Sequence, residues 1–205
     1  MNLSYHHVFQ PGTDPAAPPL LLLHGTGGNE HDLVPLARQL SPGSALLSPR
    51  GDVSEHGARR FFARLAEGVF DPAEVTRRTH ALADFILAAS AQHRLAPGRL
   101  IAIGFSNGAN IAATLLQLRP ETLAGAILLR PMVVLNQPAT SGSLQGKNIL
   151  ISSGAHDPIV PSDHQAKLAA LLEAGSATVA RHTALAGHNL TSVDVVSARQ
   201  FISRL

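Results

Sequence analysis

Three polar residues that lie far apart in the chain are of the types that nucleophilic catalysis requires. Ser106 lies in the sequence GFSNG, Asp157 in GAHDP and His188 in AGHN. A serine hydroxyl attacks an ester only when a nearby base takes its proton, and that base needs a third group to orient it. The three residues therefore predict a nucleophile (Ser106), a general base (His188) and an orienting acid (Asp157).

The sequence around Ser106 matches the pattern G-x-S-x-G, in which a serine stands on a sharp turn between a strand and a helix. A chain of this composition contains about 0.1 such matches by chance, so the flanking sequence has to decide. An apolar, strand-like run precedes the serine at 99–104, and a helix-compatible segment follows at 106–118. This context favours a nucleophile over a glycine-rich turn in which Ser106 only caps a helix.

Asp157 follows an apolar run at 148–152 that is typical of a buried strand. In open α/β sheets the active site lies beyond the carboxyl ends of the strands, which is where this loop is expected. The alternative role of Asp157 is to form a turn ahead of Pro158, and Asp163, at the start of the next predicted helix, is the rival acid. The order serine, acid, histidine is that of α/β hydrolases and favours Asp157.

His188 lies between the last predicted strand and the terminal helix, so its loop can carry the imidazole to the same edge of the sheet. His182 is the rival base. It lies at the end of that strand, where a packing or surface role is more natural. Position and chain order therefore favour His188.

The glycine-rich sequence HGTGGN at 24–29 follows a run of four leucines. In α/β hydrolases such a loop gives one backbone N–H to the oxyanion, and the residue after the nucleophile gives another. We therefore expect Thr26 and Asn107 to form the oxyanion hole, and His24 to brace the loop. A nucleotide-phosphate loop is the rival interpretation. It fails because no Gly-Lys-Ser/Thr ending follows and Glu30 stands where a dinucleotide pattern needs its third glycine.

Short apolar runs alternate with helix-patterned segments, which is typical of βαβ units around a parallel sheet. The predicted strands are 4–9, 20–23, 45–47, 99–104, 123–129, 148–152 and 177–181. The predicted helices are about 33–40, 72–93, 106–118, 161–172 and 191–204, and Asp71 and Pro72 mark the start of the second. We predict one α/β-hydrolase domain over residues 1–205, with a mostly parallel central sheet and helices on both faces. About 18 residues separate Leu129 from Asn148, too few for a large cap domain.

Composition and charge exclude several classes of protein. Hydrophobic residues make up 45% of the 205 residues and charged residues 15%, which suits a globular core. The formal net charge is only +2 and the basic residues are scattered, so we expect no nucleic-acid partner. The absence of cysteine excludes disulfides, thiolate zinc sites and a cysteine nucleophile. Without a His-Glu-x-x-His motif, we expect neither a metal nor another cofactor.

Residues 1–15 lack the basic and apolar regions of a secretory signal peptide. The longest apolar stretch, 123–135, is interrupted by Arg130 and Pro131 and is shorter than the about 20 residues that a membrane span needs. We therefore expect a cytoplasmic protein without stable membrane insertion, and a homodimer remains open.

Several motifs occur together in an order that resembles the carboxylesterase/phospholipase-type family of small α/β hydrolases, which is related to acyl-protein thioesterases. They are HGTGG at 24–28, SPRG at 48–51, RFF at 60–62, GFSNG at 104–108, RPM at 130–132, GAHD at 154–157 and GH at 187–188. The resemblance implies metal-free hydrolysis of acyl esters through a covalent acyl-serine. It also implies a substrate pocket near Phe61, Phe62 and Met132. Acyl-protein thioesterases typically carry glutamine where this chain has Asn107, which argues against protein depalmitoylation. Dienelactone hydrolases, related proteins, use a cysteine nucleophile, which this chain lacks.

The leading functional hypothesis is a carboxylesterase that cleaves small, uncharged esters with short to medium acyl chains. An acyl thioesterase or a lysophospholipase-like hydrolase is the alternative within the same chemistry. A hydrolase-fold ligand-binding protein is the non-enzymatic alternative, and the presence of Ser106, Asp157 and His188 argues against it. Residues 61–70 are a candidate partial lid.

Overall fold

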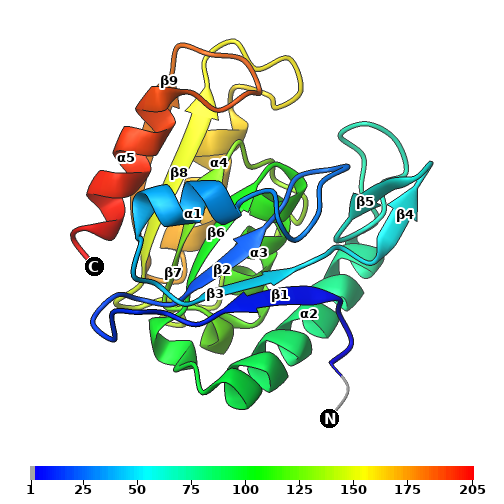
Figure 1. The fold of residues 1–205 in the computed structure, drawn as a ribbon. Helices are drawn as coiled ribbons and strands as arrows, with labels where there is room; N and C mark the ends of the chain where they lie inside the picture. Colours follow the sequence, from blue (N-terminus) through cyan, green and yellow to red (C-terminus); the bar gives the residue numbers. More distant parts are fainter. Residues whose placement is uncertain (1–2) are drawn as a thin grey trace.

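A seven-stranded sheet forms the centre of the computed structural model, which describes residues 3–205 (Figure 1). Its strands are β1 (His7–Gln10), β2 (Leu20–Leu23), β3 (Leu46–Pro49), β6 (Ile101–Phe105), β7 (Gly125–Leu129), β8 (Asn148–Gly154) and β9 (Thr178–Ala184). They lie in the order β1-β3-β2-β6-β7-β8-β9. Every neighbouring pair is parallel except β1 and β3. The predicted mostly parallel sheet is confirmed.

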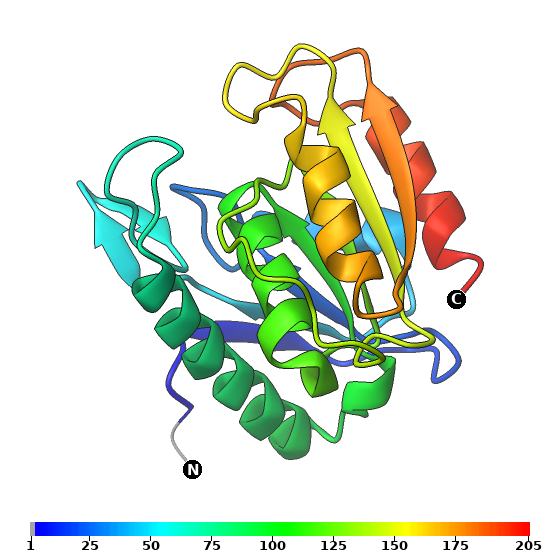
Figure 2. The same ribbon diagram turned by 180° about the vertical axis from the view of Figure 1, so that it is seen from behind.

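Helices cover both faces of this sheet, as predicted. One face carries α1 (Val34–Leu40) and α5 (Ser192–Ile202), which lie in front in Figure 1. The other face, turned to the viewer in Figure 2, carries α2 (Pro72–His93), α3 (Asn107–Leu118) and α4 (His164–Glu173). Two short 3₁₀ helices, Pro97–Arg99 and Pro120–Thr122, precede β6 and β7.

The four leucines of β2 show why the sheet forms a two-sided core. All four are 0% exposed. Side chains alternate along a strand, so Leu21 and Leu23 pack into the core under α2 and α3, whereas Leu20 and Leu22 pack into the core under α1 and α5. A parallel strand covered by helices on both faces is expected to be apolar throughout, and β2 is.

Local sequence sets the start of the longest helix. The Asp71 carboxylate accepts a hydrogen bond from the N–H of Ala73 at 2.9 Å, and Pro72 takes the first helical position. The helix ends at His93 and is capped by Arg94, whose φ of 56° is left-handed. The start predicted from Asp71 and Pro72 is confirmed.

One hairpin was not predicted. Strands β4 (Val53–Glu55) and β5 (Ala58–Arg60) form an antiparallel hairpin over residues for which the sequence predicts neither helix nor strand. The two turn residues, His56 and Gly57, both have positive φ angles, 50° and 87°. Two such residues in a row are typical of tight hairpin turns. Gly57 is typical of the second position of such a turn, but asparagine usually occupies the first position, so His56 obscured the hairpin in the sequence.

Element boundaries differ from the prediction by a few residues. Helix α4 begins at His164 rather than at 161, because the N–H of His164 bonds to the carbonyl of Pro161 and closes a turn first. The segment 130–147 between β7 and β8 has neither helix nor strand, so no cap domain lies there. No described helix combines the length and apolar composition that crossing a membrane requires.

Candidate active site

The structure brings Ser106, His188 and Asp157 together. The Oγ of Ser106 lies 2.9 Å from Nε2 of His188, and Nδ1 of the same ring lies 2.7 Å from Oδ2 of Asp157. Ser106 follows β6, Asp157 follows β8 and His188 follows β9, so all three lie at the carboxyl edge of the sheet. An ionised carboxylate only accepts, so Nδ1 carries the proton and Nε2 is free to accept the serine proton.

Ser106 stands on a strained turn between β6 and α3. Its φ of 51° and ψ of −114° lie outside the regions that ordinary residues favour. Its N–H donates to the carbonyl of Leu129 on β7 at 2.9 Å. A Cβ on Gly108 would lie 1.9 Å from the carbonyl oxygen of Leu23, so only glycine lets α3 approach β2 this closely. Backbone strain of this kind concentrates at functional sites.

Asp157 is held so that one oxygen faces His188. Its Oδ1 accepts hydrogen bonds from the N–H groups of Ile159 at 2.9 Å and Val160 at 3.1 Å, which leaves Oδ2 for the imidazole. The carboxyl side chain is only 2% exposed. The rival acid, Asp163, lies away from the site, where it forms an exposed ion pair with Lys167.

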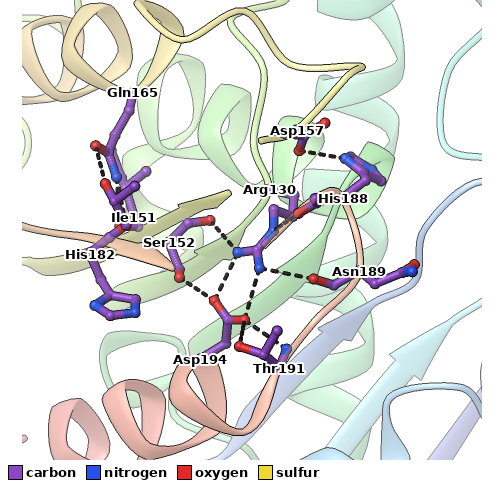
Figure 3. Close-up of polar contacts among 12 residues, drawn as sticks. Arg130, Ile151, Ser152, Asp157, Gln165, His182, His188, Asn189, Thr191 and Asp194 are labelled. Atoms are coloured by element: carbon purple, nitrogen blue, oxygen red, sulfur yellow. Dashed lines mark hydrogen bonds and ion pairs between the residues drawn. The ribbon is translucent and has the colours of Figure 1, made fainter. Parts of the chain in front are cut away.

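The loops that carry acid and base are bonded to each other. The N–H of His156, the residue before Asp157, donates to the carbonyl of Ala186, two residues before His188, at 3.0 Å. A Cβ on Gly154 would lie 2.3 Å from the carbonyl oxygen of Gly187, so the loops meet closely at this glycine. The rival base, His182, lies on β9 beside Gln165 and points away from His188 (Figure 3).

The loop that carries Thr26 presents an unused backbone donor. Among residues 3–205, neither the N–H of Thr26 nor the N–H of Asn107 donates a hydrogen bond to a protein atom. Both residues line the same pocket as Ser106. Asn107 begins α3, where the first N–H groups of a helix have no partner within the helix. Both predicted oxyanion donors are therefore available.

His24 links this loop to the loop after β3. Its Nε2 accepts from the N–H of Gly51 at 2.9 Å, so its Nδ1 donates to the carbonyl of Gly25 at 2.7 Å. Burial lowers the pKa of His24 below its ordinary value and keeps the ring neutral, as this pattern requires. The bracing role expected for His24 agrees with these contacts.

A pocket of about 310 Å³ opens beside Ser106. Its polar lining comes from Thr26, Arg60, Arg64, Glu67, Gly68, Asn107, Asn110, Arg130 and His188. Its apolar lining comes from Phe70, Phe105, Met132, Ile159 and Val160. Met132, which the resemblance implies near the substrate, is one of the lining residues. Phe70, Phe105, Ile159 and Val160 were missed, although Phe105 directly precedes Ser106 and the other two, Ile159 and Val160, follow Asp157 within three residues.

Phe61 and Phe62 do not line the pocket, which corrects the expectation from the sequence. Both are 0% exposed and belong to the core. The ring of Phe62 packs edge-on against Phe70, with centroids 5.6 Å apart, and Phe70 is the side chain that reaches the pocket. The later part of the candidate lid, 64–70, therefore forms one wall of the pocket.

Within residues 3–205, no three histidine, aspartate or glutamate side chains gather closely enough to hold a metal ion.

Similarity to known proteins identifies the family of the chain. The model of the Phospholipase/Carboxylesterase family matches residues 62–205. The chain belongs to this family. Among its relatives is the putative hydrolase MhqD of Bacillus subtilis (strain 168), which is 42% identical over 195 residues, 95% of this chain and 96% of the relative.

Solved structures of carboxylesterases superpose closely on this chain. A Bacillus cereus carboxylesterase is 43% identical with a TM-score of 0.95, covering 99% of this chain and 95% of the other. A carboxylesterase from Mesorhizobium loti is 32% identical with a TM-score of 0.91, covering 98% and 96%. The α/β-hydrolase fold and the family resemblance are confirmed, and the protein is a carboxylic-ester hydrolase.

Proposed function

We propose that Ser106 attacks the carbonyl of a carboxylic ester while His188 takes its proton and Asp157 orients the imidazole. The observation that carries this proposal is the continuous hydrogen-bond chain from Ser106 Oγ through both ring nitrogens of His188 to Asp157 Oδ2. A hydroxyl in this arrangement becomes a nucleophile at the moment its proton passes to the ring.

In the first half-reaction, Ser106 Oγ forms a bond to the ester carbonyl carbon and its proton moves to His188 Nε2. The resulting tetrahedral intermediate carries its negative charge on the former carbonyl oxygen. The bond to the alcohol oxygen then breaks, and the imidazolium gives its proton to that leaving group. An acyl-serine and a free alcohol result.

In the second half-reaction, water takes the place of the alcohol. His188 accepts a proton from the water as it attacks the acyl carbon, and returns it to Ser106 as the acid leaves. The N–H groups of Thr26 and Asn107 stabilise the oxyanion in both halves. Their lack of protein partners supports this role, because unpaired donors beside the nucleophile cost no rearrangement when charge develops.

The charges around the pocket support an uncharged substrate. Each lining arginine has an acidic neighbour: Arg64 pairs with Glu55 at 2.7 Å and Arg130 pairs with Asp194 at 2.8 Å. Arg60 also lies near Glu55, at 3.5 Å. Arg60 and Arg64 share Glu55, and Glu67 also lines the pocket, so charges of both signs border it and a neutral ester needs no new ion pair.

The size of the pocket supports short to medium acyl chains. A volume of about 310 Å³ lies at the lower end of ligand sites, and no cap domain roofs it over. Each buried methylene contributes only about 0.8 kcal/mol, so methylenes beyond the pocket add nothing to transition-state binding.

The test is kcat/KM for p-nitrophenyl esters from acetate to palmitate. We expect a rise over the short chains and a fall or plateau beyond medium length. A steady rise to palmitate would contradict the proposed chain-length preference, and matched thioesters in the same panel would report whether sulfur esters are the better substrates.

A further inference from the structure

Arg130 is a buried arginine that the mechanism above does not use. It follows β7, its side chain is 0% exposed, and its φ of 56° lies in the left-handed region that non-glycine residues rarely adopt. Its N–H donates to the carbonyl of Ser152 at 2.7 Å. A backbone conformation of this kind persists only when its surroundings fix it.

The guanidinium of Arg130 uses all five of its N–H donors within the protein (Figure 3). Two go to the carboxylate of Asp194, at 2.8 Å each, and one to the carbonyl of Ser152 at 3.3 Å. The remaining two go to the carbonyl oxygens of Gly187 at 3.1 Å and Asn189 at 3.0 Å. No donor is left for a substrate, although the residue borders the pocket.

The last two contacts lie on either side of His188. One hydrogen bond holds the carbonyl of Gly187, the residue before the histidine. The other holds the carbonyl of Asn189, the residue after it. The hydrogen bond from His156 to Ala186 also holds this loop, but it lies before Gly187, and Leu185 at the start of the loop is 90% exposed. The imidazole must reach Ser106 and Asp157 at once, so its backbone has little freedom to move.

Asp194 fixes the position of the guanidinium in turn. This residue lies in the first turn of α5 and also accepts from Ser152 Oγ at 2.6 Å and from the N–H and Oγ1 of Thr191 at 2.8 Å. Burial alone would raise the pKa of Asp194, but the hydrogen bonds from Arg130, Ser152 and Thr191 outweigh it and lower the pKa. The carboxylate therefore stays ionised opposite the arginine.

We propose that Arg130, held by Asp194, is a positioning residue that fixes the His188 loop so that the imidazole faces Ser106. The inference rests on the proposed role of His188 as the general base. Arginine suits the task because its planar fork reaches a carboxylate and two carbonyls at fixed angles, whereas a lysine ammonium has three donors on one atom. Arg130 acts through His188 and touches no reacting atom.

The first test is Arg130→Lys, which keeps the buried positive charge opposite Asp194. We expect a folded protein whose kcat/KM for p-nitrophenyl acetate falls about 100-fold, the effect of a small misplacement of a catalytic group. The matched control is Ser152→Ala, which removes a buried hydrogen bond to the same carboxylate without touching the His188 loop. The control is expected to keep wild-type kcat.

The decisive readout is the same substitution in a His188→Ala background. Because Arg130 acts through His188, Arg130→Lys is expected to change the residual activity of that variant by no more than about twofold. A purely structural role would lower the residual activity by the full 100-fold. Equal losses in both backgrounds, or wild-type kcat/KM in folded Arg130→Lys, would overturn the proposal.

A second variant keeps the test valid if Arg130→Lys does not fold. Arg130→Met with Asp194→Leu removes both charges and leaves no unpaired ion in the core. It is expected to show the same loss of kcat/KM, together with faster amide hydrogen exchange over 186–190 and unchanged exchange over 104–110. Exchange that rises equally in both segments would overturn the proposal. Wild-type activity of His188→Ala alone would instead refute the proposed function.

Discussion

The loops on the two sides of Ser106 are held by buried arginines in different ways. Arg130, on the side of the base, donates five hydrogen bonds, and two of them go to the carboxylate of Asp194 at 2.8 Å. Arg60, on the oxyanion side, donates to Thr26 Oγ1 at 2.6 Å and to the carbonyl of Phe62 at 3.1 Å. Its nearest carboxylate, on Glu55, is 3.5 Å away. The base is therefore anchored more firmly than the oxyanion loop.

The chemistry gives a reason for this difference. Proton transfer from Ser106 to His188 depends on one distance and one direction, so a misplaced imidazole is costly. The loop with Thr26 has to receive an oxygen that moves as the carbonyl becomes tetrahedral. Thr26 is exposed, and its support, the hairpin β4–β5, lies at the edge of the molecule (Figure 1). This side has room to adjust to the substrate.

The largest effects are expected on the side of the base. Asp157→Asn should lower kcat about 10⁴-fold, because an amide in place of the carboxylate favours the wrong tautomer of His188. His188→Ala should cost as much or more, up to about 10⁶-fold. Steady-state kinetics with p-nitrophenyl acetate measure both. If these two variants lost less kcat than variants on the oxyanion side, the base would not be the more demanding of the two sides.

An intermediate effect is expected from Arg60→Gln. The substitution removes the hydrogen bond to Thr26 but leaves the Thr26 N–H in place, so the loss should be about tenfold in kcat, below the 10²–10³ typical of losing a whole donor. The neighbouring Arg59→Gln is the control, since Arg59 is exposed and holds Gly27 only through its backbone carbonyl. If both variants lost activity equally, the guanidinium of Arg60 would have no specific role.

The smallest effect is on stability in acid. Hydrogen bonds from Arg50 lower the pKa of Glu30, at the end of the oxyanion loop, to about 2, although burial opposes this. An unfolded glutamate has a pKa of about 4.3. The folded pKa is the lower one, so the carboxylate stabilises the fold above about pH 4, and this contribution is lost as the pH falls toward 2.

Arg50→Met should therefore raise the pH midpoint of acid unfolding and lower the stability at neutral pH. Circular dichroism against pH measures the midpoint. Arg77→Met is the control, because Arg77 is 61% exposed and its pairing with Glu74 is expected to contribute little. An unchanged midpoint in Arg50→Met would contradict the importance of this pair.

The sequence predicted the parts of the molecule that local patterns encode. Leu20 to Leu23 read as a buried strand because parallel strands are apolar on both faces, and the turn at Ser106 has its own glycine pattern. Chain order and loop position pointed to Asp157 and His188. The structure brings the three residues together, and their catalytic role stays a prediction.

The parts that were missed depend on contacts between distant segments. Phe61 and Phe62 are apolar residues near the site, and no local pattern tells whether such a ring faces a pocket or the core. Arg130 and Asp194 are 64 positions apart, so nothing in the chain near either residue indicates their pairing. The hairpin β4–β5 was missed because its turn uses His56 before Gly57.

The most direct measurement of the central proposal is covalent labelling with a fluorophosphonate. The reagent bonds to a serine only when a neighbouring base activates it. Intact-mass analysis is expected to show one adduct per wild-type chain, mapped by peptide sequencing to Ser106, and none in Ser106→Ala or, within the same time, in His188→Ala. An adduct on another residue, or an unchanged adduct in Ser106→Ala, would contradict the proposed role of Ser106.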